Sequence, residues 1–156
     1  MAPTTQTRQP PINGRVIVTY GRSIIALMIA QSLGARGAEI IGCDDVDMTI
    51  LSFSNFVKAH EVHRPYEDDE DGYLEDMLRI VQQHKPEDDR PYLLIPSFHD
   101  ARVLARHRDK FDGLITIAAP DFDAIDRVSP KDHLADTMAD LSVPGPDTWL
   151  ATSVDE

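Results

Sequence analysis

The sequence predicts an α/β protein built as three layers: a parallel sheet with helices on both faces. Three observations favour this class. The candidate strands are short and continuously apolar, which is typical of strands covered on both sides. Helical stretches alternate with them along the chain. The first such pair, Arg15–Gly37, joins a β-branched run to a long apolar helix through a tight turn. In folds of this class, ligands meet the backbone at that turn.

Five strands are expected, and turn-forming or polar residues separate each of them from the neighbouring helices. The third strand alternates only weakly, and Pro65 closes it. The segment 48–56 before it is ambiguous. The predicted strands are Arg15–Tyr20, Ala38–Cys43, Val57–His63, Pro91–Pro96 and Gly113–Ala118.

The first predicted helix is apolar on more than one stripe, so we expect it to be buried on most sides, against a second domain or a second subunit. The last helix has strong start signals, with Ser129 at the N-cap and Pro130 at the first helical position. The predicted helices run from Arg22 or Ser23 to Ala35, over Asp71–His84, from Ser97 through Phe111, over Ala119–Arg127 and over Ser129–Leu141, the last with Leu134, Met138 and Leu141 on its inner face.

This element order predicts one Rossmann-like domain over residues 14–143. Residues 1–13 form a polar, proline-containing stretch and are expected to be a disordered leader. Residues 144–156 begin with a proline-rich hinge and are expected to start a linker to another domain.

The composition limits the possible partners and compartments. The net charge of −12 and the low isoelectric point of about 4.7 disfavour nucleic acid and anionic lipid. No apolar run approaches the ~20 residues that a membrane span needs. Cys43 is the single cysteine, so an internal disulfide is impossible and a reducing, cytoplasmic location is expected.

The first turn carries one glycine and matches neither of the common phosphate-binding loops. The dinucleotide pattern G-x-G-x-x-G and the Walker pattern G-x-x-x-x-G-K-[ST] are both absent. What remains is Gly21, Arg22 and Ser23 at a helix N-terminus. These residues either hold an anion such as a carboxylate or phosphate, or only cap the helix.

Two further polar residues follow predicted strands. Asp44 comes after the second strand, where a dinucleotide domain would hold a ribose; alternatively it caps the following turn. Ser97 is first an N-cap candidate and second a ligand contact. His60 and His63 would point to opposite faces of a strand, so no shared metal is expected. No residue is assigned a catalytic role.

Several segments, taken in order, resemble the opening of ATP-grasp ligases of the carbamoyl-phosphate-synthase-like and biotin-carboxylase-like group. The matching segments are GRVIVTYGRSIIALMIAQSLGARGAEIIGCDD, SNFVKAHEVHRP, YLLIPSFHDARVLARHRDKF and APDFDAIDRVSPKDHLADTMADLSVPGPDTW. The last is the most specific, because it resembles a helix pair that carries a lysine and ends in a proline turn. Together they resemble the pre-ATP-grasp domain.

The resemblance implies a ligase that uses ATP and Mg²⁺ to convert a carboxylate to an acyl phosphate, which an amine or thiol attacks. The glycine-rich lid and the metal ligands would belong to a C-terminal ATP-grasp domain, the implied partner, so residues 1–156 would be inactive alone. Lys131 matches a family position linked to ATP, and an ordinary exposed helix residue is the alternative. Gly21, Arg22 and Ser23, with Asp44 and Ser97, would face the shared cleft on the substrate side.

Two other functions are compatible with the sequence. One is a free-standing acidic module that binds a metabolite or docks to a partner. The other is a non-catalytic subunit, including a homodimer, that uses the broad apolar surface of the first helix.

Overall fold

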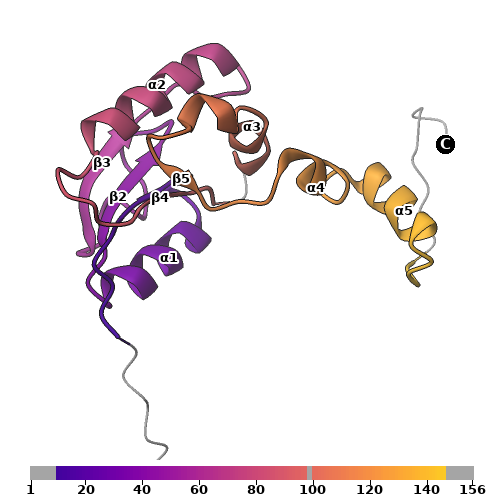
Figure 1. The fold of residues 1–156 in the computed structure, drawn as a ribbon, viewed down its shortest axis with the longest axis horizontal. Helices are drawn as coiled ribbons and strands as arrows, with labels where there is room; N and C mark the ends of the chain where they lie inside the picture. The colour runs from indigo at the N-terminus through magenta and orange to yellow at the C-terminus, as the bar shows by residue number, and fades with distance from the viewer. Residues whose placement is uncertain (1–9, 98–99, 147–156) are drawn as a thin grey trace, which may run out of the picture. The chain divides into compact units, whose positions relative to one another are not determined.

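The computed structural model describes residues 10–97 and 100–146. The chain divides into two compact units, Met1–Ala119 and Pro120–Glu156. The first unit contains the whole sheet and the second contains two helices (Figure 1). The predicted domain limits at residues 13 and 143 remain predictions.

The sheet has five strands in the order β3-β2-β1-β4-β5, and every neighbouring pair is parallel. β1 is central, with Val16 opposite Ile40 of β2 and Leu93 of β4. The five predicted strands are therefore all present, with ends that shift by a few residues. Their bounds are β1 Arg15–Val18, β2 Glu39–Asp44, β3 Val57–Val62, β4 Tyr92–Ile95 and β5 Thr116–Ile117.

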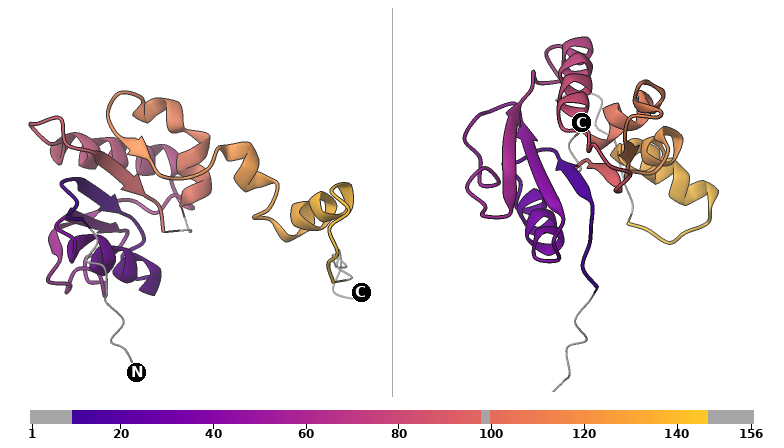
Figure 2. Two further views of the ribbon diagram at one scale, coloured as in Figure 1. Left: turned by 60° about the horizontal axis from the view of Figure 1, so that its bottom comes forward. Right: turned by 60° about the vertical axis from the view of Figure 1, so that its left-hand side comes forward.

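Helices cover both faces of the sheet, as Figure 2 shows for α1 on one side and α2 on the other. The predicted three-layer α/β architecture is therefore confirmed. Right-handed crossovers between parallel strands require this arrangement. The helices of the first unit are α1 Ile24–Gly34, α2 Glu70–Gln83, α3 Ala101–Arg106 and the 3₁₀ turn η1 Arg108–Phe111.

Side chains alternate across the sheet and build two cores. Val16 and Val18 of β1 face α1, whereas Ile17 between them faces α2 and α3. The predicted core stripe of α2 is confirmed, since Tyr73, Leu74, Met77, Ile80 and Val81 are all buried.

Within the described part of the chain, α1 is buried only on the side that faces the sheet, and cover of its other sides by a second domain or a second subunit remains a prediction. Only Ala26 and Ala30 of α1 are buried, whereas Ile24 and Met28 are 61% and 64% exposed. The two alanines let the helix backbone approach the sheet closely, and Ile29 and Leu33 pack against the same core. Apolar content alone does not distinguish this arrangement from a helix that is covered all round.

Ser97 does not cap the third helix, because α3 begins only at Ala101 and Asp100 occupies the capping position. Asp100 is also buried. This change matters for the site described below.

The second unit contains α4 Phe122–Asp126 and α5 Lys131–Asp140. Pro130, not Ser129, occupies the N-cap of α5, so Lys131 is the first helical residue. Leu134 and Leu141, which were expected on its inner face, are exposed.

In the part of the chain that the structure describes, no helix is both long and apolar enough to cross a membrane.

Leu51 supports the α1 side of the core and gives a direct test of the packing. Its side chain is fully buried, and a Cβ added at Gly42 would lie 2.8 Å from its Cδ2 atom. We expect Leu51→Ala to lower the free energy of unfolding by about 2–4 kcal/mol, because it removes buried methyl groups and leaves a cavity. Urea denaturation measures this change. The control Val62→Ala, at a 42% exposed side chain outside that core, should cost about 0.5 kcal/mol or less. Equal losses in the two variants would contradict the assignment.

Candidate functional site

The candidate site lies at the carboxyl ends of β1 and β4. From β1 the chain first builds the β2–β3 side of the sheet and then returns to build the β4–β5 side. The loops after β1 and β4 therefore diverge from neighbouring strands. In open α/β sheets, this switch point is where ligands bind.

A fully buried carboxylate joins four elements at this point. Asp100 accepts hydrogen bonds from the hydroxyls of Thr19, at 2.7 Å, and Tyr73, at 2.6 Å. The Thr19 hydroxyl oxygen in turn accepts from the backbone N–H of Ser97 at 3.1 Å. Because Thr19 follows β1, Ser97 follows β4, Tyr73 lies on α2 and Asp100 precedes α3, the cluster holds the switch point together.

Burial raises the pKa of Asp100, and the two hydroxyl donors only partly oppose this effect. Burial also raises the pKa of Tyr73, with the nearby Asp100 charge as a further cause. Ser97 is 2% exposed, and within residues 10–97 and 100–146 its Oγ atom has no hydrogen-bond partner. A buried hydroxyl without a partner is uncommon, and it marks this edge as a place where a polar group can bind.

The first turn is fixed by packing and by a carboxylate. Tyr20 has a φ of 54°, a left-handed conformation that is unusual for a residue other than glycine. A Cβ at Gly21 would lie 2.9 Å from Thr49 Oγ1, so glycine is needed there for close approach of the loop after β2. The Ser23 side chain accepts from the N–H of Ile25 at 3.1 Å and thereby caps α1, as one of the two interpretations predicted.

Arg22 and Asp44 form the second anchor of the turn. Asp44 is 1% exposed and accepts from the backbone N–H and the Nε of Arg22 at 2.8 and 3.0 Å. The Arg22 guanidinium also pairs with Asp45. These hydrogen bonds raise the pKa of Arg22 and leave its charge compensated. The turn therefore does not present the free cation that an anion site would need.

A small hollow of about 20 Å³ opens beside this cluster. That volume suits one group the size of a water molecule or an ammonium ion. Its lining residues are Tyr20, Asp44, Asp45, His63, Pro65, Tyr66, Glu67 and Asp100.

His63 gives the hollow its hydrogen-bonding polarity. Its Nδ1 lies 2.9 Å from the carbonyl oxygen of Arg64, which can only accept, so Nδ1 carries the proton. The buried Nε2 then presents a lone pair, and it has no hydrogen-bond partner among the residues that the structure describes. With four carboxyl groups around it, the hollow is rich in acceptors and suits a ligand that donates N–H groups.

The other histidine of the pair contributes elsewhere. His60 Nε2 lies 3.2 Å from Thr49 Oγ1 on the α1 side of the sheet. Within residues 10–97 and 100–146, no group of three or more histidine, cysteine or acidic side chains has the arrangement of a metal site.

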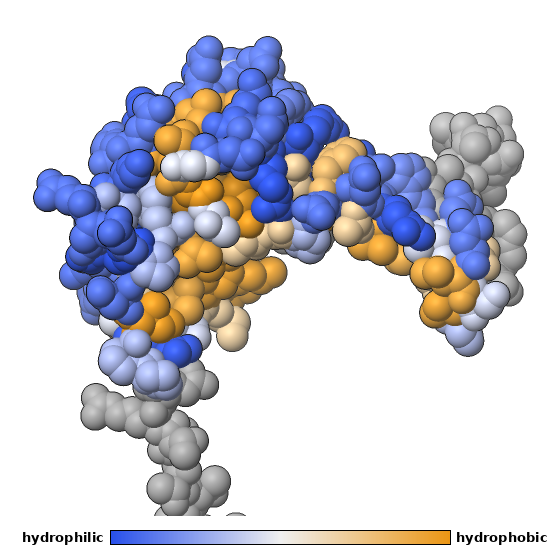
Figure 3. All heavy atoms as spheres, in the orientation of Figure 1, coloured by the Kyte–Doolittle hydropathy of each residue, from blue (hydrophilic) through white to orange (hydrophobic). Residues whose placement is uncertain are grey.

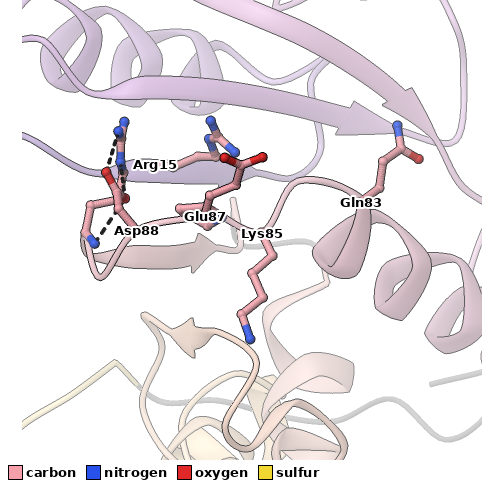
Figure 4. Close-up of a pocket in the computed structure, with 7 residues that line it drawn as sticks. Arg15, Gln83, Lys85, Glu87 and Asp88 are labelled. Atoms are coloured by element: carbon pink, nitrogen blue, oxygen red, sulfur yellow. Dashed lines mark hydrogen bonds and ion pairs between the residues drawn. The ribbon is translucent and has the colours of Figure 1, made fainter.

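A larger cavity of about 600 Å³ lies at the opposite, amino-terminal edge of the sheet (Figure 4). Ion pairs occupy its charged walls: Arg15 pairs with Glu39 at 2.6 Å, and Arg90 pairs with Asp88 at 2.6 Å and with Glu39 at 3.0 Å. Since the arginines of this cavity are already paired with carboxylates, the carboxyl edge remains the better candidate.

Sequence reasoning selected the first turn and Asp44 but missed the centre of the site. Asp100, Thr19 and Tyr73 were not singled out, and His63 was considered only for metal. The available signal was a polar residue, Thr19, that ends an apolar strand. Lys131 is an exposed residue at the start of α5 in the second unit, so its link to ATP remains a prediction.

The pKa of Asp100 predicts a specific pH dependence of stability. Folding raises the pKa of Asp100. The contribution of Asp100 to the free energy of unfolding is therefore fully present below its unfolded pKa of about 3.9, and it is lost as the pH rises through the folded pKa. We expect the unfolding free energy of the native chain to fall relative to that of Asp100→Asn as the pH rises from about 4 to 8. Urea denaturation at several pH values checks this.

Asp88 provides a control with the opposite sign. The hydrogen bond with Arg90 lowers the pKa of Asp88. The contribution of Asp88 to the free energy of unfolding is therefore present above its unfolded pKa and is lost as the pH falls through the folded pKa. The difference in unfolding free energy between the native chain and Asp88→Asn should therefore disappear at low pH. A pH-independent difference between the native chain and Asp100→Asn would show that Asp100 does not titrate as described.

No protein-family model and no curated protein matches the sequence. Among solved structures, the fold is similar to N5-carboxyaminoimidazole synthetase from Staphylococcus aureus, solved in complex with ADP, with a TM-score of 0.55 and 14% sequence identity. The match covers 83% of this chain but only 30% of that one. This likeness of fold confirms the predicted α/β class and is consistent with the Rossmann-like pre-ATP-grasp domain that the sequence resembles.

Proposed function

We propose that the chain is the N-terminal domain of an ATP-dependent ligase of the ATP-grasp type, and that it contributes the binding site for an amine substrate. Two observations support this proposal. The fold is similar to a synthetase that was solved with ADP. The switch point carries a hollow whose polar lining accepts hydrogen bonds. The second observation favours the amine among the possible nucleophiles, and it carries the substrate assignment.

The hollow recognises a cation by charge and by hydrogen-bond direction. A protonated amine offers three N–H donors and one positive charge. His63 Nε2 and the carboxylate of Glu67 would accept from it, and the compensated Arg22 would not repel it. A carboxylate or phosphate in the same place would meet several acidic side chains and be repelled.

ATP and Mg²⁺ would be held mainly by domains outside residues 1–156. At the carboxyl edge of the described sheet, the Arg22 side chain is already engaged with Asp44 and Asp45, so the first turn does not fit a triphosphate. Lys131 is the residue that this domain would direct toward a phosphate, where it would act as a point charge. ATP would supply the activation of the carboxylate as an acyl phosphate. A lining carboxylate such as Glu67 would take one proton from the bound ammonium group, and the hollow would orient the freed amine lone pair toward the carboxyl carbon, from which phosphate leaves.

Amine binding to the purified chain tests the site directly. We expect ethylammonium to shift the amide NMR signals around residues 20, 45, 63–67 and 100 with a Kd of about 1 mM, whereas acetate and inorganic phosphate should leave them unchanged. His63→Ala and Glu67→Gln should each weaken binding about threefold to tenfold. Glu87→Gln, in the cavity at the opposite edge, should have no effect. Preferential binding of acetate or phosphate would overturn the substrate assignment.

An ATP turnover assay tests whether the groups that act on ATP lie in another domain. We expect purified residues 1–156 to release no phosphate from ATP above the background rate, with or without Mg²⁺, because the resemblance places the lid and metal ligands in another domain. A coupled phosphate-release assay measures this, with a complete ATP-grasp ligase as the positive control. Appreciable Mg²⁺-dependent turnover by this chain would contradict the proposal.

A further inference from the structure

The first unit carries a large apolar surface that its own sheet does not cover. We define the apolar face by three residues of α1 and five of the connection between β2 and β3. Their exposed fractions range from 37% to 74%. The residues are Ile24, Ile25, Met28, Val46, Met48, Ile50, Phe53 and Phe56.

The two segments form one continuous surface, because the β2–β3 connection packs along α1. Near the start of the helix, the N–H of Leu51 donates to the carbonyl of Gly21 at 3.1 Å. At the helix end, a Cβ on Gly34 would lie 2.6 Å from the Cβ of Phe56. Figure 3 shows apolar residues gathered on the lower side of the first unit, where Figure 1 places α1.

This concentration differs from the ordinary scatter of exposed apolar side chains. Of the nine large hydrophobic residues exposed in the described part of the first unit, eight belong to the apolar face and only Val62 lies outside it. Isolated exposed residues need no explanation, but a contiguous patch of this kind marks an interaction surface.

The charge distribution favours a second copy of the chain as the occupant. The segments 23–34 and 46–56 contain one charged residue, Asp47, whereas 27% of the whole chain is charged and the net charge is −12. Two copies that meet elsewhere bring acidic side chains together, whereas contact through this face does not. Ile24 and Met28 lie one helical turn apart, so two copies of α1 can pack against each other.

The size of the face is sufficient for a stable dimer. Residues with these exposed fractions offer on the order of 100 Å² each, which sums to roughly the 800 Å² per partner that a specific interface buries. We therefore propose that the apolar face is the contact between two copies of the chain in a two-fold symmetric dimer.

Sedimentation equilibrium of the full 156-residue chain tests the dimer. We expect the native chain to be dimeric at micromolar concentration, and Met28→Lys and Phe53→Lys to raise the dimer Kd about tenfold or more, because each places a charge in the contact. Val62→Lys is the matched control, since Val62 is 42% exposed outside the face, and its Kd should stay within about twofold. Thermal unfolding should confirm that all three variants fold.

Two results would overturn the proposal. One is a native chain that remains monomeric up to about 100 µM, as expected if the face binds a different protein or another part of the chain. The other is a Val62→Lys variant that dissociates as much as Met28→Lys does. Because amine binding and dimer formation involve different residues, failure of either leaves the other test intact.

Discussion

The arrangement of the sheet's carboxyl edge depends on one buried carboxylate. Asp100 binds two hydroxyls, from Thr19 and Tyr73, and through Thr19 it reaches the backbone of Ser97. These hydrogen bonds give the loops after β1 and β4 a shared partner at the point where they diverge. Burying an acid is unfavourable unless its oxygens are satisfied. The same residues that stabilise the edge therefore also keep a polar centre inside an otherwise apolar core.

The fold could be predicted from the sequence because the patterns that indicate its strands and helices are local. Continuous apolar runs such as Val16–Val18 predict strands buried on both faces, and the regular spacing of Met77 and Ile80 predicts the inner stripe of α2. The burial of α1 could be predicted only in part: Ala26 and Ala30 are buried against the sheet and Ile29 and Leu33 pack beside them, whereas Ile24 and Met28 are exposed. The apolar content of the helix does not show which side meets the sheet, where close packing favours small side chains.

The site was only half predictable for a related reason. Ser23 caps α1, and Asp44 accepts from the N–H of Asp45 in the turn that follows it, as one interpretation of each residue predicted. The hydrogen bonds of Asp44 with Arg22 were not predicted. Asp100 and His63 belong to the site because of contacts between residues that are distant in the sequence. Tyr73 contacts both side chains, and it lies 27 positions from Asp100. The polarity of the hollow depends on which nitrogen of His63 faces the Arg64 carbonyl, and no sequence pattern encodes that orientation.

The connection between β2 and β3 links the two surfaces of the first unit. At its start, Asp44 and Asp45 line the hollow and hold Arg22; a few residues later, Met48, Ile50 and Phe53 form part of the apolar face. Leu51 anchors the middle of this segment in the α1-side core, beside Gly21 of the first turn. A contact that orders the apolar face would therefore also restrict the motion of one wall of the hollow. In this way an acidic domain can associate through a face with few charges while its carboxylates stay available at the edge of the sheet.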